Sequence, residues 1–185
     1  ERKESSMNIF HLDDSAITSA RMLCDKHVPK MLLETCQMLS TAVRNQIPQV
    51  IKGDSVYKSA YPKHPMTIWV GDSYKNFMWT LEHGAEINKQ YQYRFGKIHK
   101  SERILDTVWS LLDDIRESFI SNQGQDAFDL TTVPLCMPDQ YKWCDNHIDS
   151  YREYYFHDKQ YFAKWDKGVR KPRWFREMEA KHGEQ

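Results

Sequence analysis

The sequence predicts an all-α protein that folds as a single compact domain of about four main helices. Three observations predict this class. Apolar residues recur every three to four positions over long stretches, as they do along the buried face of a helix. Only seven Gly and seven Pro interrupt the 185 residues, so tight turns are few. Hydrophobic residues make up 40% of the chain, which is typical of a globular protein with one core.

The domain is expected to cover residues 7–176. Met7 resembles a native start, so residues 1–6 are expected to be an added segment or a short natural extension, and residues 177–185 a charged tail. No apolar run approaches the roughly 20 residues of a membrane span, and no signal peptide is visible. The four cysteines form no CxxC pair, which favours free thiols in a reducing cytoplasm. The pattern does not indicate an oligomeric state.

The first helix is expected over residues 15–44, after an extended entry that ends in a cap at Ser15. Its stretch "CDKHVPKMLLET" is unusual, because Pro29 stands in the middle of an amphipathic pattern. Proline removes a backbone donor inside a helix, so we expect a kink at Pro29. The apolar side of this helix holds Met22, Val28, Leu32, Leu33, Cys36, Leu39 and Val43.

Three further helices follow a loop over residues 45–65. The second is expected over 72–95, after the apolar lead-in "HPMTIWVGDS", and Gly96 is a natural stop for it. The third is expected over 101–118, and the last over 148–165.

The polar side of the first helix carries a cluster that suits acid–base chemistry. His27 and Glu34 are seven residues apart, two helical turns, so both point the same way, and Lys30 lies between them. A histidine beside a carboxylate and the ammonium groups of Lys26 and Lys30 can be tuned to exchange protons near neutral pH. The alternative is a solvated helix face with a Lys30–Glu34 pair.

Metal ligands are a second possibility that the spacing raises. Cys24 and His27 are three apart, as are Cys144 and His147, and two such pairs could form a tetrahedral zinc site. Cysteine is also common in protein cores, and we expect neither a metal nor another cofactor.

The stretch over residues 151–176 is basic and aromatic, although the net charge of the chain is zero. Residues 151–176 hold eight Lys or Arg and three acidic residues. Cations interleaved with rings suit phosphates and bases, so contacts to nucleic acid are expected from Arg170, Lys171, Arg173 and Trp174. The alternative is a set of core rings with solvated charges.

Cations also gather in "YRFGKIHK", at the end of the second helix. Arg94, Lys97 and His99 suit a phosphate contact there, but cations at a helix C-terminus also interact favourably with its dipole. No Gly-rich phosphate loop, GxSxG elbow or HExxH motif is present.

The chain resembles two families. Its motifs from Met7 to Phe175 resemble a family of small proteins of tailed phages, which implies a viral role in the infected host cell but no particular chemistry. The motifs that carry this resemblance are "MNIFHLD", "CDKHVPKMLLE", "YRFGKIH", "MPDQYK" and "YREYYFHDKQYFAKW".

The second resemblance is to phage pyrimidine-dimer DNA glycosylases of the endonuclease V type, over roughly residues 7–96. These are small all-α proteins, and "KHVPK" resembles a segment of their first helix. The resemblance places Lys26 and Lys30 where that family has DNA-contacting arginines, and His27 where it has its catalytic glutamate. His64 matches a histidine that precedes the long second helix.

The resemblance also implies a mechanism from which this sequence departs. In that family the N-terminal amine attacks the sugar C1′ to make an imine, and the glutamate assists. Here Met7 is followed by Asn8, which disfavours removal of the methionine, and the given chain begins with Glu1. The resemblance therefore implies an active site rebuilt around His27, with Glu34 as its carboxylate.

The expected function is thus a phage DNA-processing enzyme of N-glycosylase type that acts on a damaged or modified base. The expected partner is DNA or a nucleotide. The alternative is a non-catalytic phage accessory protein that binds a nucleotide or a host protein.

Overall fold

The computed structural model describes residues 7–183. This part of the chain is helical and contains no strand, with eight α-helices and two short 3₁₀ helices. The α-helices are α1 (Ala16–Arg21), α2 (His27–Gln46), α3 (Pro65–Asp72), α4 (Tyr74–Phe95), α5 (Glu102–Ser110), α6 (Leu112–Gln123), α7 (His147–Lys159) and α8 (Arg173–Gly183). The 3₁₀ helices are η1 (Gly124–Phe128) and η2 (Asp139–Tyr141). No helix in the described residues is long and apolar enough to cross a membrane.

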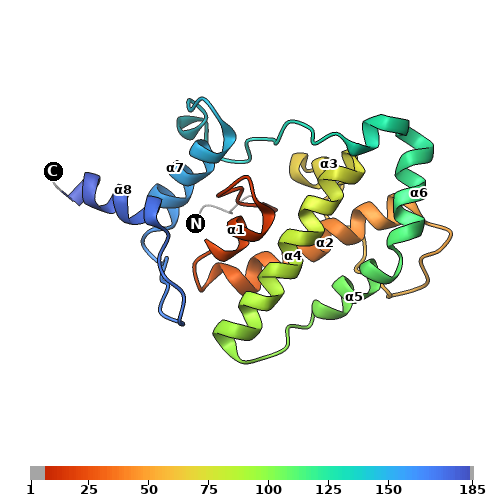
Figure 1. Cartoon of the computed structure of the whole chain (residues 1–185), viewed down its shortest axis with the longest axis horizontal. Coiled ribbons are helices and arrows are strands. Elements are labelled where there is room, and N and C mark those ends of the chain that lie inside the picture. The colour runs from red at the N-terminus through yellow and green to blue at the C-terminus, as the bar shows by residue number, and fades with distance from the viewer. Residues whose placement is uncertain (1–6, 184–185) are drawn as a thin grey trace.

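The long helices α2 and α4 form the centre of the fold, and α1 and α3 pack against them. Figure 1 shows α2 passing behind α4, with α5 and α6 at one end of the molecule and α7 and α8 at the other. The close approach of α2 and α4 depends on Gly84. A Cβ atom at Gly84 would lie 3.1 Å from Cγ2 of Thr35 and 3.3 Å from Cδ2 of Leu105, which is too close for an ordinary contact.

The structure corrects the prediction for the first helix. Instead of one helix over 15–44 with a kink, the chain forms α1 and α2, separated by residues 22–26. Pro29 is the third residue of α2 and so lies in its first turn. The amide groups of the first helical turn have no intrahelical acceptor, so a proline is tolerated there.

The second predicted helix, expected over 72–95, forms nearly as predicted as α4, whereas the third is divided. Ser73 is extended (φ −152°, ψ 159°), so it separates α3 from α4, and its side chain caps α4 by accepting from the amide of Asn76. The lead-in 65–72 is itself a helix, which starts with Pro65 after the cap His64. Gly96 ends α4 with φ 63°, as predicted. Leu111 separates α5 from α6.

The last predicted helix is shorter than expected, and a further helix follows it. α7 ends at Lys159 instead of residue 165, and α8 begins at Arg173 in the basic stretch that was expected to contact nucleic acid. α8 is attached by Trp174 and Phe175, which are buried against Tyr155, Phe156 and Trp165.

The connection from α6 to α7 crosses the molecule along the upper edge in Figure 1 and is fixed by side chains of the core. The amide of Thr131 donates to Oδ1 of Asn76, whose Nδ2 donates to Oγ1 of Thr131. The hydroxyl of Tyr151 donates to the carbonyl of Pro134 at 2.7 Å. These bonds place residues 134–138 beside α7.

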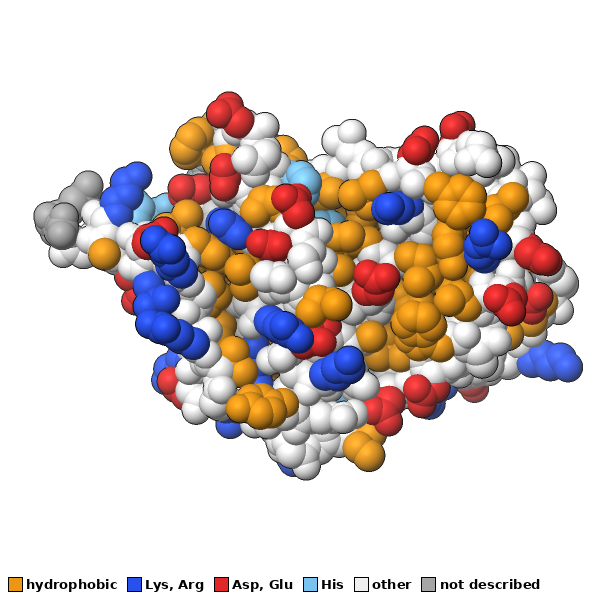
Figure 2. Space-filling model, in the orientation of Figure 1, with side chains coloured by type: hydrophobic (Ala, Val, Ile, Leu, Met, Phe, Trp, Pro, Cys, Tyr) orange, Lys and Arg blue, Asp and Glu red, His pale blue; other side chains and the backbone are white. Residues whose placement is uncertain are grey.

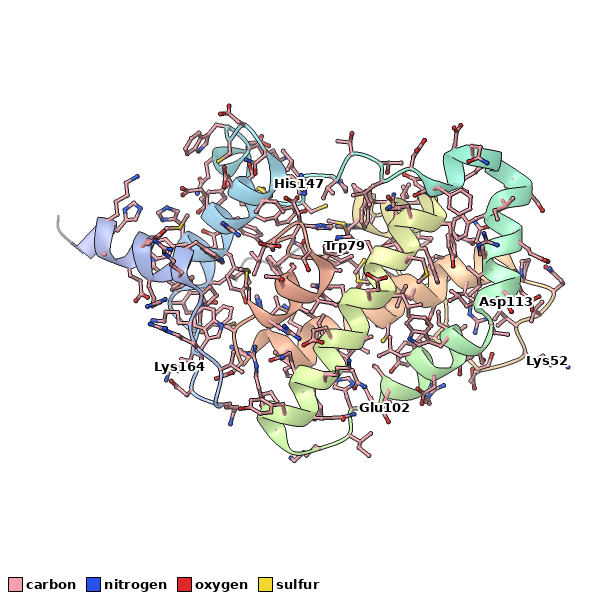
Figure 3. The ribbon with its side chains drawn as sticks, in the orientation of Figure 1. Lys52, Trp79, Glu102, Asp113, His147 and Lys164 are labelled. Carbon is pink, nitrogen blue, oxygen red and sulfur yellow. The ribbon has the colours of Figure 1, made fainter. Side chains whose placement is uncertain are left out.

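A layer of stacked rings joins the N-terminal segment to α4 and α7. The imidazole of His11 stacks on Trp79 at 4.3 Å between centroids and meets the edge of His147 at 5.8 Å. Figure 3 shows Trp79 and His147 close together where α4 passes the start of α7. Trp79 in turn stacks on His83, and burial lowers the pKa of His83 to about 4. This layer therefore holds its imidazoles in the neutral form at neutral pH.

Candidate active site

A pocket of about 1270 Å³ lies where the N-terminal ends of α2 and α3 meet residues 134–138 and the C-terminal half of α7. Its lining comes from four parts of the chain that are far apart in the sequence. The lining residues are Lys26, His27, Lys30, His64, Pro65, Pro134, Leu135, Cys136, Met137, Pro138, Tyr154, His157, Asp158, Lys159, Tyr161 and Phe162.

The pocket is rich in cationic and proton-exchanging groups. Three lysines and three histidines line it, whereas Asp158 is the one acidic residue of its lining. That carboxylate accepts a hydrogen bond from the hydroxyl of Tyr141. The positive end of the α2 dipole lies at the same place, because α2 starts at His27. The arrangement favours an anionic ligand, such as a phosphate group.

The break between α1 and α2 sets the position of Lys26 and His27. The guanidinium of Arg94 donates to the carbonyls of Arg21 and Leu23 and pairs with Oδ1 of Asp25 at 3.2 Å. Oδ2 of Asp25 accepts from the amide of Asp166 at 2.7 Å. Because α4 and the segment after α7 both fix this break, α2 starts at a defined point beside the pocket.

Three aromatic rings surround the imidazole of His27, one stacked on its face and two in edge-to-face contact. It is 2% exposed, and its imidazole stacks on Phe10 with centroids 5.0 Å apart and planes inclined by 19°. The rings of Tyr155 and Phe162 meet it edge to face, each at 5.2 Å. The ring orientation is therefore fixed, while the side chain still contributes to the pocket lining.

Two other lining groups have pKa values shifted by burial. Burial lowers the pKa of His64, whose Nδ1 accepts from the amide of Met66 and so caps α3. Burial raises the pKa of the Cys136 thiol, which is therefore protonated at neutral pH and a weak nucleophile.

A family model described as pyrimidine dimer DNA glycosylase matches residues 7–100, which are 94 of the 185 residues. The chain belongs to this family. The match confirms the resemblance to the glycosylases over nearly the span from which it was predicted. No curated protein and no solved structure matches the chain.

The family match covers the α2 and α3 side of the pocket, while residues 134–138 and α7 lie outside it. Four residues predicted for the glycosylase site line the pocket, namely Lys26, His27, Lys30 and His64. Lys26 and Lys30 are exposed to solvent. Glu34 is 8% exposed and lies two turns after His27 on the same side of α2, but it is not among the residues that line the pocket.

The cations at the end of α4 have other roles in this glycosylase fold. Arg94 is buried in the break described above. His99 donates from Nε2 to the carbonyl of Pro29 and accepts at Nδ1 from the amide of Ser101, which uses both ring nitrogens. Lys97 is exposed but does not line the pocket.

The basic C-terminal stretch pairs largely with the protein itself. Lys171 pairs with Glu179 at 2.8 Å and Arg173 with Glu177 at 2.8 Å, while Arg170 is exposed. Figure 2 shows a group of Lys and Arg side chains at the end of the molecule that carries α8. Trp174 is 8% exposed and donates to Sδ of Met22, so its ring faces the interior and not a nucleic-acid base.

The sequence reasoning missed Lys159, Tyr154 and Tyr161. A signal for Lys159 exists, because it follows Tyr151 and Tyr155 at intervals of four and so falls on the buried stripe of α7. Tyr161, at the edge of the pocket, is 80% exposed, which a core ring would not be. Residues 134–138 carried no sequence signal for a site.

The two Cys–His pairs do not meet as a zinc site. Within residues 7–183, no three His, Cys, Asp or Glu side chains are grouped so that they could hold a metal ion. Cys24 is buried, and its amide donates to the hydroxyl of Tyr155.

Proposed function

We propose that this protein is a DNA N-glycosylase that removes a base of a pyrimidine dimer from duplex DNA, with the cationic pocket receiving the extruded nucleotide. The observation that carries the proposal is the pocket itself, which combines three lysines and three histidines with one acidic residue in a chain of this family. We also propose, from the first resemblance, that the enzyme serves a tailed phage in its infected host.

The size of the pocket suits a nucleotide with part of its backbone. Pockets for small molecules usually have volumes of about 300–1,000 Å³, and this one has about 1270 Å³. An enzyme that acts on a base in a duplex must extrude the nucleotide, together with its phosphates, from the stack. Lys26 and Lys30, which are exposed at the start of α2, bind those phosphates in this proposal.

Two groups on α2 carry the chemistry in this proposal. Breaking the bond between C1′ and the base leaves negative charge on the base and positive charge on the sugar. His27 donates a proton to the departing base, since its ring is fixed at the pocket wall by Phe10. The carboxylate of Glu34, on the same side of α2, stabilises the positive charge on the sugar.

Tyr161 supplies a stacking surface at the edge of the pocket. Its ring is 80% exposed and meets Phe162 edge to face at 4.8 Å. An exposed ring beside cations offers a face on which a neighbouring base can stack. Lys26 lies over the ring of Phe162 at 4.7 Å, which keeps a cation next to this surface.

The test uses a duplex oligonucleotide with one pyrimidine dimer and the same duplex without damage. Abasic sites are measured by strand cleavage in alkali after incubation with the protein. We expect abasic sites in the damaged duplex alone, and a loss of about 100-fold or more in His27→Gln. His182→Gln is the control, because His182 lies outside the pocket lining.

Two outcomes of this test would contradict the proposal or a part of it. Tight binding of the damaged duplex or of a nucleotide, without any abasic site, would support the alternative of a non-catalytic binding protein. Equal activity of His27→Gln and the parent would remove His27 from the mechanism.

A further inference from the structure

We infer that the carboxylate of Asp158 is a catalytic base, which activates the water molecule that attacks C1′ of the extruded nucleotide, and that Tyr141 is its positioning residue. This inference rests on the proposed glycosylase function. It assigns the nucleophile of the reaction to water, and both residues lie outside the span of the family match.

Few groups of the pocket are suited to accept a proton from water. Among the described residues that line it, Asp158 is the one acidic residue. His157 shares a hydrogen bond with Glu153 at 3.1 Å, and His64 uses its Nδ1 to cap α3. The thiol of Cys136 is protonated, because burial raises its pKa. Since carboxylates serve widely as general bases, Asp158 is the lining residue best suited to this role.

The hydroxyl of Tyr141 orients the side chain of Asp158. It donates to Oδ1 of Asp158 at 2.5 Å, which is within the range for a hydroxyl bound to a carboxylate. Burial, and then this hydrogen bond, raise the pKa of Tyr141 to about 12, so the hydroxyl keeps its proton at neutral pH. In the described part of the chain, Tyr141 is the one hydrogen-bond partner of the Asp158 side chain. Oδ2 is therefore able to accept a proton from water.

Tyr141 is itself fixed between α7 and the segment that precedes it. It is 6% exposed, and its ring is parallel to the imidazole of His157 within 9°, with centroids 6.0 Å apart. Its ring also contacts Tyr154 at 5.6 Å. η2, which contains Tyr141, starts directly after Pro138, the last residue of the pocket-lining segment 134–138. The hydrogen bond to Asp158 thus connects this segment to α7.

A row of aromatic rings separates Asp158 from the proposed acid. Phe10 stacks on His27 at 5.0 Å and contacts Tyr154 at 5.8 Å. Tyr154 in turn contacts Tyr141, which holds Asp158 at the far end of the row. His27 and Asp158 therefore line the same pocket at different points. A displacement at C1′ needs this separation, because water approaches one side of the sugar while the base leaves from the other.

The proposed reaction balances with water as the only co-reactant. A lone pair of the water oxygen forms a bond to C1′, and one proton of that water passes to Asp158. The bond from C1′ to the base breaks, its electron pair leaves with the base, and His27 donates a proton to the base. The product is an abasic sugar with a hydroxyl group at C1′. The proton on Asp158 then returns to His27 through solvent.

The first test identifies the nucleophile in the unmodified protein. The protein is incubated with the dimer-containing duplex in buffer that contains methanol, and the products are analysed by mass spectrometry. A site that activates water should also activate methanol, so we expect a methyl glycoside at C1′ beside the abasic sugar. An abasic duplex incubated without the protein is the control for spontaneous exchange.

Two results of this first test would overturn the inference. One is the formation of abasic sites without any methyl glycoside. The other is a covalent adduct between protein and DNA that borohydride traps at the same rate as the base is lost, since an amine of the protein would then be the nucleophile.

The second test separates a chemical role of Asp158 from a structural one. Asp158→Asn keeps the shape of the side chain but is not a base, so we expect the single-turnover rate of base removal to fall roughly 100-fold or more. The damaged duplex should bind at least as tightly as to the parent, because a negative charge is removed from a site for phosphates. Asp158→Glu keeps the carboxylate and should retain more activity than Asp158→Asn.

Tyr141→Phe tests the positioning role. It removes only the hydroxyl, so we expect the same rate to fall roughly tenfold without weaker binding of the duplex. The matched control is Asp139→Asn in η2, because the Asp139 side chain is 97% exposed, pairs with Lys142 and lies outside the pocket lining. This control should react as the parent does. A parental rate in Tyr141→Phe would refute its positioning role.

Failure of this inference can be distinguished from failure of the proposed function. Abasic sites that form in Asp158→Asn at the parental rate would refute the catalytic base and leave the glycosylase activity standing. Absence of abasic sites with the parent protein would refute the proposed function, and the inference with it. If circular dichroism shows that Asp158→Asn is misfolded, the methanol product and the rate of Tyr141→Phe decide.

Discussion

Arg94→Met should strongly destabilise the protein, although the sequence alone favours a phosphate contact or a helix-end cation at this position. The guanidinium side chain is 0% exposed, and the side chain of its partner Asp25 is 10% exposed. Methionine fills similar space but leaves the carbonyls of Arg21 and Leu23 without these donors. Breaking a buried ion pair by removing one partner costs about 3–5 kcal/mol, because the other charge stays buried.

The measurement is urea denaturation followed by far-UV circular dichroism. We expect Arg94→Met to lose about 3–5 kcal/mol in the free energy of unfolding. Adding Asp25→Asn should recover part of that loss, because the uncompensated carboxylate is removed, and a double-mutant cycle gives the coupling. Lys97→Met, an exposed change near the same helix end, should stay within about 0.5 kcal/mol of the parent. A decrease of less than about 1 kcal/mol in the free energy of unfolding of Arg94→Met would refute the structural role of Arg94. It would indicate that Arg94 behaves as a surface cation.

Three further predictions follow from the ring layer, the pocket edge and the C-terminal cations. Because burial lowers the pKa of His83 from 6.5 to about 4, the fold favours its neutral form. The contribution of His83 to stability should therefore be full above pH 6.5 and be lost, by about 3 kcal/mol, as the pH drops to about 4. His83→Gln should make the decline of stability at low pH less steep in urea titrations, and an unchanged decline would contradict the assignment. Tyr161→Ala should weaken binding of the damaged duplex by about 1–3 kcal/mol in fluorescence anisotropy, while Tyr161→Phe should bind as the parent does; equal binding by the alanine variant would exclude stacking. Replacing Lys171 and Arg173 by Ala should change the slope of log affinity for DNA against log salt concentration by less than the equivalent of about one phosphate contact, because both cations pair with glutamates of α8. A change equivalent to about two contacts would instead support the predicted role of both residues in DNA binding.

The helical class could be predicted from the sequence, but the number of helices could not. Apolar periodicity continues across Leu111, so α5 and α6 read as one long pattern, and the apolar lead-in over 65–72 was not predicted to be the separate helix α3. The break at residues 22–26 is fixed by Arg94 and Tyr155, which lie far along the chain. Such long-range hydrogen bonds leave no periodic signal.

Local sequence patterns likewise predict some of the pocket-lining residues and miss others. Lys26, His27 and Lys30 stand out because charges are unusual in an apolar helix, and all three line the pocket. Lys159 was read as one of many basic residues in an aromatic stretch, since its burial depends on the packing of α7. Trp174 shows the opposite case, because an aromatic residue in a basic segment resembles a stacking group until its contacts with the core are known.

The two sides of the pocket have different origins along the chain, and this has a consequence for relatives of the protein. A fragment that ends at residue 100 would contain the whole family match and the α2 and α3 side of the pocket, but neither residues 134–138 nor the pocket-lining residues of α7. Membership of the family therefore depends on one side of the pocket, while the other side comes from residues outside the family match. Under the proposed function, we expect a homologue with the same α2 and α3 and a different α7 to contact the DNA backbone in the same way but to differ in the groups that face the base.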